Sequence, residues 1–190
     1  MRTIIELLRH AKAGRRDEWG DACDRERPLS DEGRAQADRL TSELAAGGPI
    51  AALYTSPLLR CRQTLEPLAE TLGVPLAQRE ALAEAPGVPV VDAGSLWVAS
   101  AWLGGRAVAL LDELVATHPG QRVVCCSHGD VLPSLLALLA GRDGVAVTDT
   151  HLRKGARARA LFERGRCVDV ECLEAPHAAS APSPSTPAAT

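Results

Sequence analysis

The stretch that decides the fold is "IIELLRHAKAGRR", residues 4–16. Its first residues are apolar and partly β-branched, with one glutamate among them, which is typical of a buried strand. Arg9 and His10 follow directly, and no further acidic residue comes before Asp17. We therefore predict a strand over residues 3–8 whose carboxyl end presents an imidazole and several cations at one place.

Similar apolar runs alternate with amphipathic segments along the rest of the chain. Further strands are predicted over 49–57 and 121–129, and helices over 27–48, 58–73, 104–120 and 130–141. Pro67 is expected to kink the second of these helices or to start a new segment. Residues 74–84 are predicted to be extended or mixed, 87–97 to form a loop, and 158–174 to form a closing β-hairpin around Arg164–Arg166. This alternation predicts an α/β fold, a three-layer α/β/α sandwich with a mainly parallel central sheet.

Length and composition favour one domain over residues 1–174, followed by a tail over 175–190 that is rich in Ala, Pro, Ser and Thr and predicted to be disordered. The net charge of -3 argues against a nucleic-acid partner and against binding to an anionic membrane. No apolar run is long enough for a transmembrane helix, and the first residues lack a secretory signal. The six cysteines form no C-x-x-C pair, so we expect reduced thiols and a cytoplasmic protein.

Three of the predicted strands end in polar, mostly basic residues. These ends are Arg9-His10, Ser56 to Arg60, and Ser127-His128. In open α/β sheets ligands bind beyond the carboxyl ends of the strands, so these side chains are expected to converge. Guanidinium groups donate hydrogen bonds in pairs that match the oxygens of a phosphate group. The sequence thus predicts a phosphate receptor at this edge of the sheet.

Several other classes of enzyme lack their motifs in this chain. A serine hydrolase would need a G-x-S-x-G nucleophile elbow, and a nucleotide-driven kinase would need a P-loop. The spacings of cysteine and histidine fit no zinc site, so we predict no metal and no cofactor. His118, His151 and His177 are expected to be solvated, and Ser56, which precedes a proline, is expected first of all to mark a turn.

Four blocks of the sequence carry a resemblance to a known family. "LLRHAKAGRR", "RPLSDEGRAQA", "SPLLRCRQT" and "SHGDVLPSLL", in this order, resemble the histidine phosphatase superfamily, whose members have the phosphoglycerate mutase-like fold. The short length looks most like the branch of SixA-like phosphohistidine phosphatases. The histidine phosphatase domain attached to some Nudix hydrolases is similar too, including a late "RKG" at Arg153–Gly155. The resemblance extends from about residue 3 to about residue 173.

The resemblance implies a role for each matched residue. His10 corresponds to the nucleophile that becomes phosphorylated, Arg9 and Arg60 to phosphate ligands, and His128 to a second catalytic histidine that stabilises charge. The family's proton donor is an acid in the middle of the chain, for which Glu84 is the first candidate and Glu80 the second, provided that burial raises its pKa. Lys12, Arg15, Arg16 and Lys154 are expected to be accessory, with Lys12 facing phosphate. Ala11 stands where the family has Gly, and a positive φ there would strain the loop.

The expected activity follows from these roles. We expect a metal-independent phosphatase that forms a phosphohistidine on His10 and acts on a phosphomonoester or on protein phosphohistidine. Its partner is then a phosphorylated small molecule or a phosphohistidine protein. Two alternatives stay open: a catalytically inert phosphate-binding or interaction module of the same fold, and a nucleotide or other small-molecule phosphohydrolase.

Overall fold

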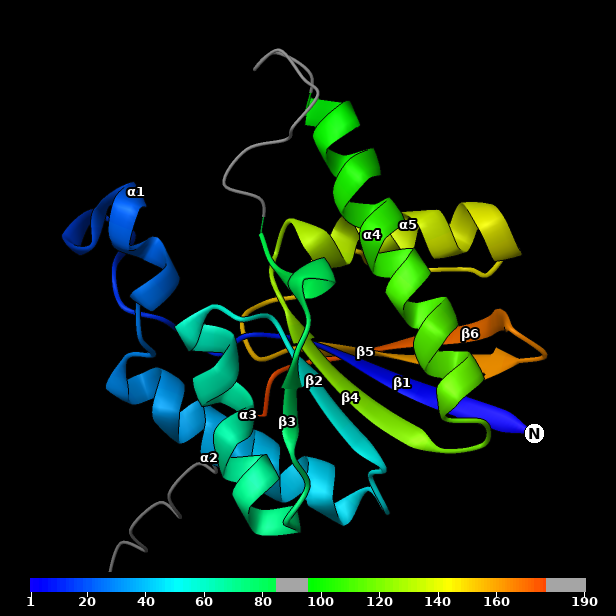
Figure 1. The fold of residues 1–190 in the computed structure, drawn as a ribbon, viewed down its shortest axis with the longest axis horizontal. Helices are drawn as coiled ribbons and strands as arrows, with labels where there is room; N and C mark the ends of the chain where they lie inside the picture. The colour runs from blue at the N-terminus through cyan, green and yellow to red at the C-terminus, as the bar shows by residue number, and fades with distance from the viewer. Residues whose placement is uncertain (85–95, 177–190) are drawn as a thin grey trace, which may run out of the picture.

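The computed structural model describes residues 1–84 and 96–176 and shows one twisted sheet with helices packed around it (Figure 1). Within these residues the sheet has six strands in the order β3-β2-β4-β1-β5-β6. They are β1 (Arg2–Arg9), β2 (Ala52–Thr55), β3 (Leu76–Gln78), β4 (Arg122–Ser127), β5 (Arg157–Glu163) and β6 (Arg166–Leu173). The strands β1, β2, β3 and β4 all run parallel to one another, and β5 and β6 extend the sheet by antiparallel pairing. The prediction of an α/β/α sandwich with a mainly parallel sheet is therefore confirmed.

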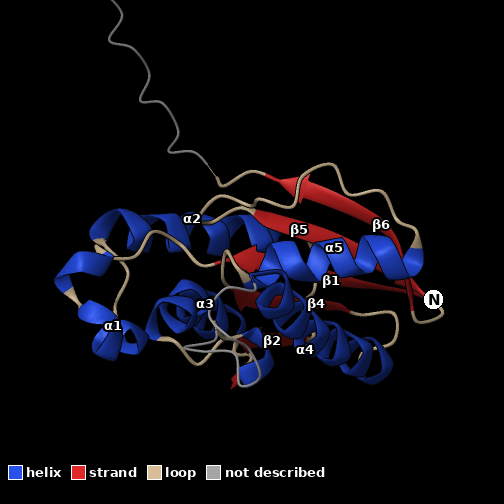
Figure 2. Cartoon of the chain, turned by 90° about the horizontal axis from the view of Figure 1, so that it is seen from above, coloured by secondary structure: helices blue, strands red, loops and turns tan. Residues whose placement is uncertain are grey.

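The helices fall into two groups, one on each face of the sheet (Figures 1 and 2). The longer helices are α2 (Asp31–Ala46), α3 (Leu59–Leu72), α4 (Leu96–Thr117) and α5 (Val131–Asp143). A short helix α1 (Gly20–Cys23) and three 3-10 turns, η1 (Arg16–Glu18), η2 (Asp24–Glu26) and η3 (Glu80–Leu82), lie in the connections. α2 and α3 bury one apolar cluster against the sheet, and α4 and α5 bury the other.

β1 contributes to both clusters because successive side chains of a strand point to opposite faces. Ile5 and Leu7 belong to the cluster under α4 and α5, whereas Leu8 belongs to the cluster under α2 and α3. The single glutamate of this strand, Glu6, is fully buried. Its carboxylate accepts hydrogen bonds from three arginines, namely Arg122 Nε at 3.0 Å, Arg157 Nε at 3.2 Å and Arg159 Nε at 3.0 Å. An internal ion cluster thus joins β1 to β4 and β5.

Ser30, in the stretch predicted as a helix over 27–48, is a typical N-cap residue, and the structure confirms that role. Its Oγ atom accepts a hydrogen bond from the backbone N–H of Gly33 at 3.2 Å, so the helix begins at Asp31. One predicted strand and one predicted helix have clearly different bounds in the structure. The strand predicted over 49–57 is limited to β2. The helix predicted over 104–120 begins eight residues earlier, at Leu96, because apolar residues before Gly104, among them Leu103, pack into the core.

Other expectations can be compared directly. Pro67 lies inside α3, which is one helix over Leu59–Leu72, so this proline starts no new segment. The predicted hairpin is confirmed, and its two-residue turn consists of Arg164 and Gly165, both with positive φ.

Residues 87–95 of the predicted loop and 177–190 of the predicted tail lie outside the described residues. All six cysteines are free thiols. Among the described helices, none has the length and hydropathy that crossing a membrane requires.

Candidate active site

The carboxyl ends of β1, β2 and β4 lie side by side, as the sequence predicts. The backbone N–H of His10 donates to the carbonyl of Ser127 at 3.0 Å, and that of Ser56 donates to the carbonyl of Cys126 at 3.0 Å. These contacts place the rings of His10 and His128 with their centroids 5.3 Å apart and their planes inclined at 61°. Both rings are buried.

The ring of His10 is held in one orientation by its neighbour in the chain. Its Nδ1 atom lies 2.7 Å from the carbonyl oxygen of Ala11, to which it donates, so Nε2 is the unprotonated nitrogen of the neutral ring. Burial and the charge of His128 lower the pKa of His10 well below 6.5, Arg60 and Arg9 lower it further, and the hydrogen bond to the Ala11 carbonyl opposes them only in part. His10 is therefore a neutral imidazole with a free electron pair at neutral pH.

Ala11 fits its position without strain. Among the described residues Arg164 is the only non-glycine residue with a positive φ, so the backbone at Ala11 is in an ordinary region. Its side chain is fully buried against Leu29 and Ala37, and its N–H donates to Thr64 Oγ1 at 3.0 Å. The replacement of the family's glycine therefore leaves the loop unstrained.

Arg9 and Arg60 flank the histidines. Arg9 donates from one terminal nitrogen to the carbonyl of Leu152 at 2.8 Å, and its guanidinium lies so close to Gly129 that a Cβ there would be 2.5 Å from Cζ. Arg60, in the first turn of α3, is 0% exposed. The Nε atoms of both arginines are buried with no hydrogen-bond partner among the described residues. Buried cations with unpaired donors are suited to receive an anion.

His128 has a hydrogen-bond acceptor at each ring nitrogen. Nδ1 lies 2.8 Å from Oε1 of Glu84, and Nε2 lies 2.7 Å from the hydroxyl of Ser56. Burial lowers the pKa of His128, but the sulfur of Cys61, which lies 3.4 Å from Nε2 and has its own pKa lowered to about 6, and the Glu84 carboxylate raise it more, to about 9. Ser56 therefore hydrogen-bonds a histidine of the site, in addition to forming the turn that its sequence context indicates.

Glu84 reaches the site and Glu80 does not. The carboxylate of Glu84 accepts hydrogen bonds from His128 and, at 2.6 Å, from a terminal nitrogen of Arg60. Burial raises the pKa of Glu84, but these two cations lower it more strongly, so the net shift is far below the usual range. In the free site, burial alone therefore does not give Glu84 the raised pKa that the role of proton donor requires. Glu80 is exposed and pairs with Arg25 at 3.5 Å.

A pocket of about 520 Å³ opens above these residues. Six cationic side chains line it, Arg9, Lys12, Arg15, Arg16, Arg27 and Lys154, together with two carboxylates, Glu84 and Asp130. Partial burial and the neighbouring cations lower the pKa of Lys154. The accessory residues predicted from the sequence therefore all face this pocket.

Two residues of the site, Asp24 and Arg27, are not among the candidates that the sequence singles out. Asp24 and Arg27 are almost fully buried, and the Nε atom of Arg27 donates to Oδ1 of Asp24 at 2.7 Å. They belong to the stretch "DRERP", whose alternating charges are usual in a solvated loop. His118 also differs from its expected solvated state, because it is half-buried and its Nε2 lies 3.0 Å from the hydroxyl of Tyr54.

The charge of the site favours an anion over a metal ion. Ligand atoms of His10, Glu84 and His128 lie within 4.8 Å of one another, a spacing that a metal ion could bridge. However, the Glu84 carboxylate already pairs with the guanidinium of Arg60, and Arg9 lies in the same pocket. A cation would therefore be repelled by two guanidinium groups, whereas a phosphate would be attracted.

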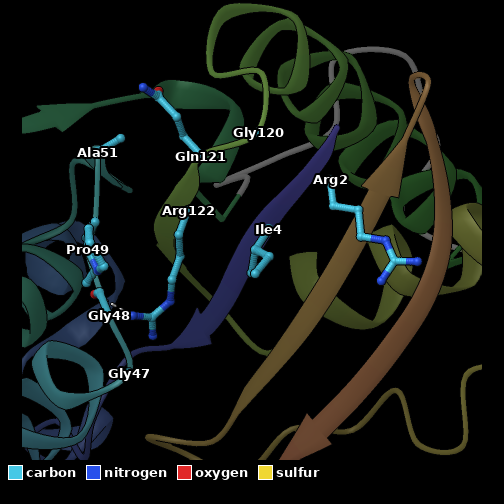
Figure 3. A pocket seen from close by; sticks show the side chains of 10 residues that line it. Arg2, Ile4, Gly47, Gly48, Pro49, Ala51, Gly120, Gln121 and Arg122 are labelled. Atoms are coloured by element: carbon cyan, nitrogen blue, oxygen red, sulfur yellow. Dashed lines mark hydrogen bonds between the residues drawn. The ribbon is translucent and has the colours of Figure 1, made fainter.

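A second hollow, of about 410 Å³, lies at the opposite edge of the sheet (Figure 3). Its one buried cation is Arg122, which points toward Gly48 in the figure. The guanidinium of Arg122 is already paired with Glu6 and with the carbonyls of Leu44 and Gly48, at 2.9 and 3.1 Å. We assign no binding role to this hollow.

Comparison with known proteins agrees with this geometry. A family model described as the histidine phosphatase superfamily (branch 1) matches residues 5–88 and 101–172. The 8-oxo-(d)GTP phosphatase of Mycolicibacterium smegmatis is 33% identical over 177 residues, which is 92% of this chain. The chain spans about half, 49%, of the length of that relative.

Solved structures share the fold at lower sequence identity. The protein histidine phosphatase SixA, complexed with tungstate, has a TM-score of 0.64 and 20% identity, with 90% of this chain and 96% of SixA covered. The phosphoserine phosphatase of Entamoeba histolytica, in complex with 3-phosphoglyceric acid, has a TM-score of 0.68 and 17% identity, with 90% and 97% covered.

Proposed function

Because the chain belongs to branch 1 of the histidine phosphatase superfamily, we propose that it is a phosphatase that uses His10 as a covalent nucleophile. The observation that supports this most directly is the state of His10. It is a neutral ring, held through Nδ1 by the Ala11 carbonyl, and it lies beside Arg9, Arg60 and a protonated His128.

The first step is an in-line attack by Nε2 of His10 on phosphorus. A P–N bond forms as the bond from phosphorus to the leaving atom breaks, and the negative charge on the equatorial oxygens increases in reach of fixed donors. Arg9, Arg60 and His128 supply those donors, with Lys12 at the edge of the pocket. Each preorganised donor of this kind typically contributes on the order of 10²–10³-fold in rate. Positive charge that a metal would otherwise supply thus comes from side chains.

Glu84 is our candidate for the proton donor. In the free site its carboxylate lies between Arg60 and His128, where a phosphoryl oxygen would make the same contacts. A phosphoryl group that takes these two partners removes the interactions that lower the pKa of Glu84 and adds a negative charge that raises it. As its pKa rises, Glu84 takes up a proton from solvent and gives it to the leaving atom. Its carboxylate then accepts a proton from the water that attacks phosphorus as the P–N bond to His10 breaks.

Two substrate classes fit the pocket. A phosphomonoester or a protein phosphohistidine needs only the donors around His10. A nucleoside polyphosphate would also use Lys12, Arg15, Arg16 and Lys154, because one phosphoryl group cannot engage all six cations of the pocket. The second class is favoured by this excess of cations and by the similarity to an 8-oxo-(d)GTP phosphatase.

Hydrolysis of 4-nitrophenyl phosphate in the presence of EDTA tests the activity. We expect turnover, and we expect His10→Ala to lower it by more than about 10³-fold and to abolish labelling of the protein by a ³²P-phosphorylated substrate. The matched control is His118→Ala, a half-buried histidine before the amino end of β4, which should keep normal kinetics. Near-normal turnover by His10→Ala would refute the mechanism, and phosphate binding without turnover by the parent protein would support the inert module.

A substrate panel then separates the two classes. It compares kcat/KM for a phosphohistidine protein, 4-nitrophenyl phosphate, nucleoside di- and triphosphates and 3-phosphoglycerate. A preference of more than about tenfold for a nucleotide, equal to about 1.4 kcal/mol, supports the nucleotide class, and the reverse preference supports phosphohistidine. Mutase turnover of 3-phosphoglycerate would contradict both.

A further inference from the structure

We propose that Asp24 is a positioning residue that orients two guanidinium groups, those of Arg60 and Arg27, toward the phosphoryl group. This inference rests on the proposed function. Asp24 opens the 3-10 turn η2 and is 8% exposed, although it lies 36 residues from Arg60 in the sequence. A buried carboxylate in a site that binds anions would repel the substrate, so it needs a reason to be there.

Asp24 holds Arg60 from two sides. Its backbone carbonyl accepts a hydrogen bond from one terminal nitrogen of Arg60 at 2.8 Å, and its Oδ2 atom lies 3.1 Å from the other terminal nitrogen. Glu84 contacts Arg60 through one nitrogen only, at 2.6 Å. When a phosphoryl oxygen displaces Glu84, the two contacts with Asp24 therefore keep the guanidinium in place. Glu84 is the exchangeable partner of Arg60, and Asp24 is the fixed one.

The other carboxylate oxygen of Asp24 orients Arg27. Oδ1 accepts from Nε of Arg27 at 2.7 Å, and a terminal nitrogen of Arg27 donates to the carbonyl of Gly14 at 3.0 Å. Arg27 is 7% exposed and lines the pocket, so its remaining terminal nitrogen is the one that a ligand can reach. One carboxylate thus separates two buried cations that would otherwise repel each other.

Electrostatics support this role. Burial raises the pKa of Asp24, but its hydrogen bond from Arg27 and the charge of Arg60 lower it more, so the group is ionised at neutral pH. The substitution Asp24→Asn removes the negative charge of this side chain and keeps its shape. It should therefore misalign Arg60 and Arg27 without removing either cation. A misplaced catalytic group costs on the order of 10²-fold in rate.

A double-mutant cycle tests the proposal. We expect Asp24→Asn to lower kcat for 4-nitrophenyl phosphate by about 10²-fold, and to lower it by clearly less in an Arg60→Ala background, where only the effect through Arg27 remains. The matched control is Asp143→Asn, which makes the same change at a 2% exposed carboxylate paired with Arg142 at 2.8 Å, outside this pocket. It should leave kcat unchanged. Equal losses in both backgrounds would overturn the proposal.

Two further measurements keep the result decisive. The same cycle on orthovanadate binding, followed by calorimetry, needs no turnover, so it tests Asp24 even if the proposed phosphatase activity is absent. We expect Asp24→Asn to weaken the binding of vanadate more in the protein that retains Arg60 than in the Arg60→Ala variant. Asp24→Glu keeps the charge but shifts it by one methylene, and it should also lose kcat. Full activity of Asp24→Glu would show that the charge alone matters and would refute positioning.

Discussion

At the scale of single residues, the two histidines of the site have opposite pKa shifts although their rings are neighbours. The pKa of His10 falls because the ring is buried and faces cations, whereas that of His128 rises to about 9 because the Cys61 sulfur and the Glu84 carboxylate outweigh the effect of burial. One ring is thereby neutral and the other charged at the same pH, as the proposed roles of nucleophile and donor require.

This pair predicts the pH dependence of the reaction. Lowering the pH to 6.5 leaves His10 unprotonated, since its pKa lies well below that value, while raising the pH through about 9 removes the proton of His128. We expect kcat/KM to be level from pH 6.5 until the pH approaches 9 and then to fall. In His128→Gln, a slower enzyme, the fall should be absent. If it persists there, another group causes it.

At the scale of elements, two adjacent glycines of α4 have opposite surroundings. A Cβ on Gly104 would lie 2.7 Å from Leu138 Cδ1 and 2.9 Å from the carbonyl oxygen of Ser134, both in α5. A Cβ on Gly105 would meet nothing within 4 Å. Gly104 therefore permits the close contact of the two helices, and Gly105 has no such function.

Alanine at these two positions should change stability in opposite directions. Gly104→Ala should destabilise the protein by about 1–3 kcal/mol because it overpacks the contact between the helices. Gly105→Ala should stabilise it by about 0.5–1 kcal/mol because alanine loses less backbone freedom in a helix. Urea unfolding of both variants gives the midpoints and slopes. Shifts of the same sign would contradict the packing of α4 on α5.

At the scale of the whole molecule, the charge of the pocket is opposite to that of the chain. The chain has a net charge of -3, whereas six cations and two carboxylates line the pocket. The positive potential of the pocket attracts anionic substrates, and the negative charge of the rest of the surface repels them.

The rate should therefore depend on ionic strength. Raising NaCl from about 0.05 M to about 0.5 M shortens the screening length from roughly 14 Å to about 4 Å. We expect kcat/KM for a nucleoside diphosphate to fall by about tenfold, while kcat at saturation changes by less than about twofold. A control salt series at constant ionic strength, with the anion varied, excludes competition by chloride. Equal kcat/KM at both salt concentrations would contradict electrostatic attraction by the pocket.

The sequence by itself determined the strands that precede Arg9, Ser56 and Ser127-His128, the closing hairpin, and the motifs that bring Arg9, His10, Arg60 and His128 to one edge. These features depend on residues a few positions apart, such as the apolar run before His10 or the turn at Arg164 and Gly165. The resemblance to the family also ranked Glu84 first and Glu80 second as the proton donor, but no local pattern shows which carboxylate reaches the site.

Only the tertiary structure decided which acid reaches His128, that Asp24 holds Arg60, and that Glu6 is buried among three arginines. It also decided that α4 begins before Gly104 and Gly105, because the side chain of Leu103 packs into the core. Asp24 and Arg60 are 36 residues apart, and Glu6 and Arg157 are 151 apart. Burial and pKa depend on such distant neighbours, which no local pattern of side chains encodes.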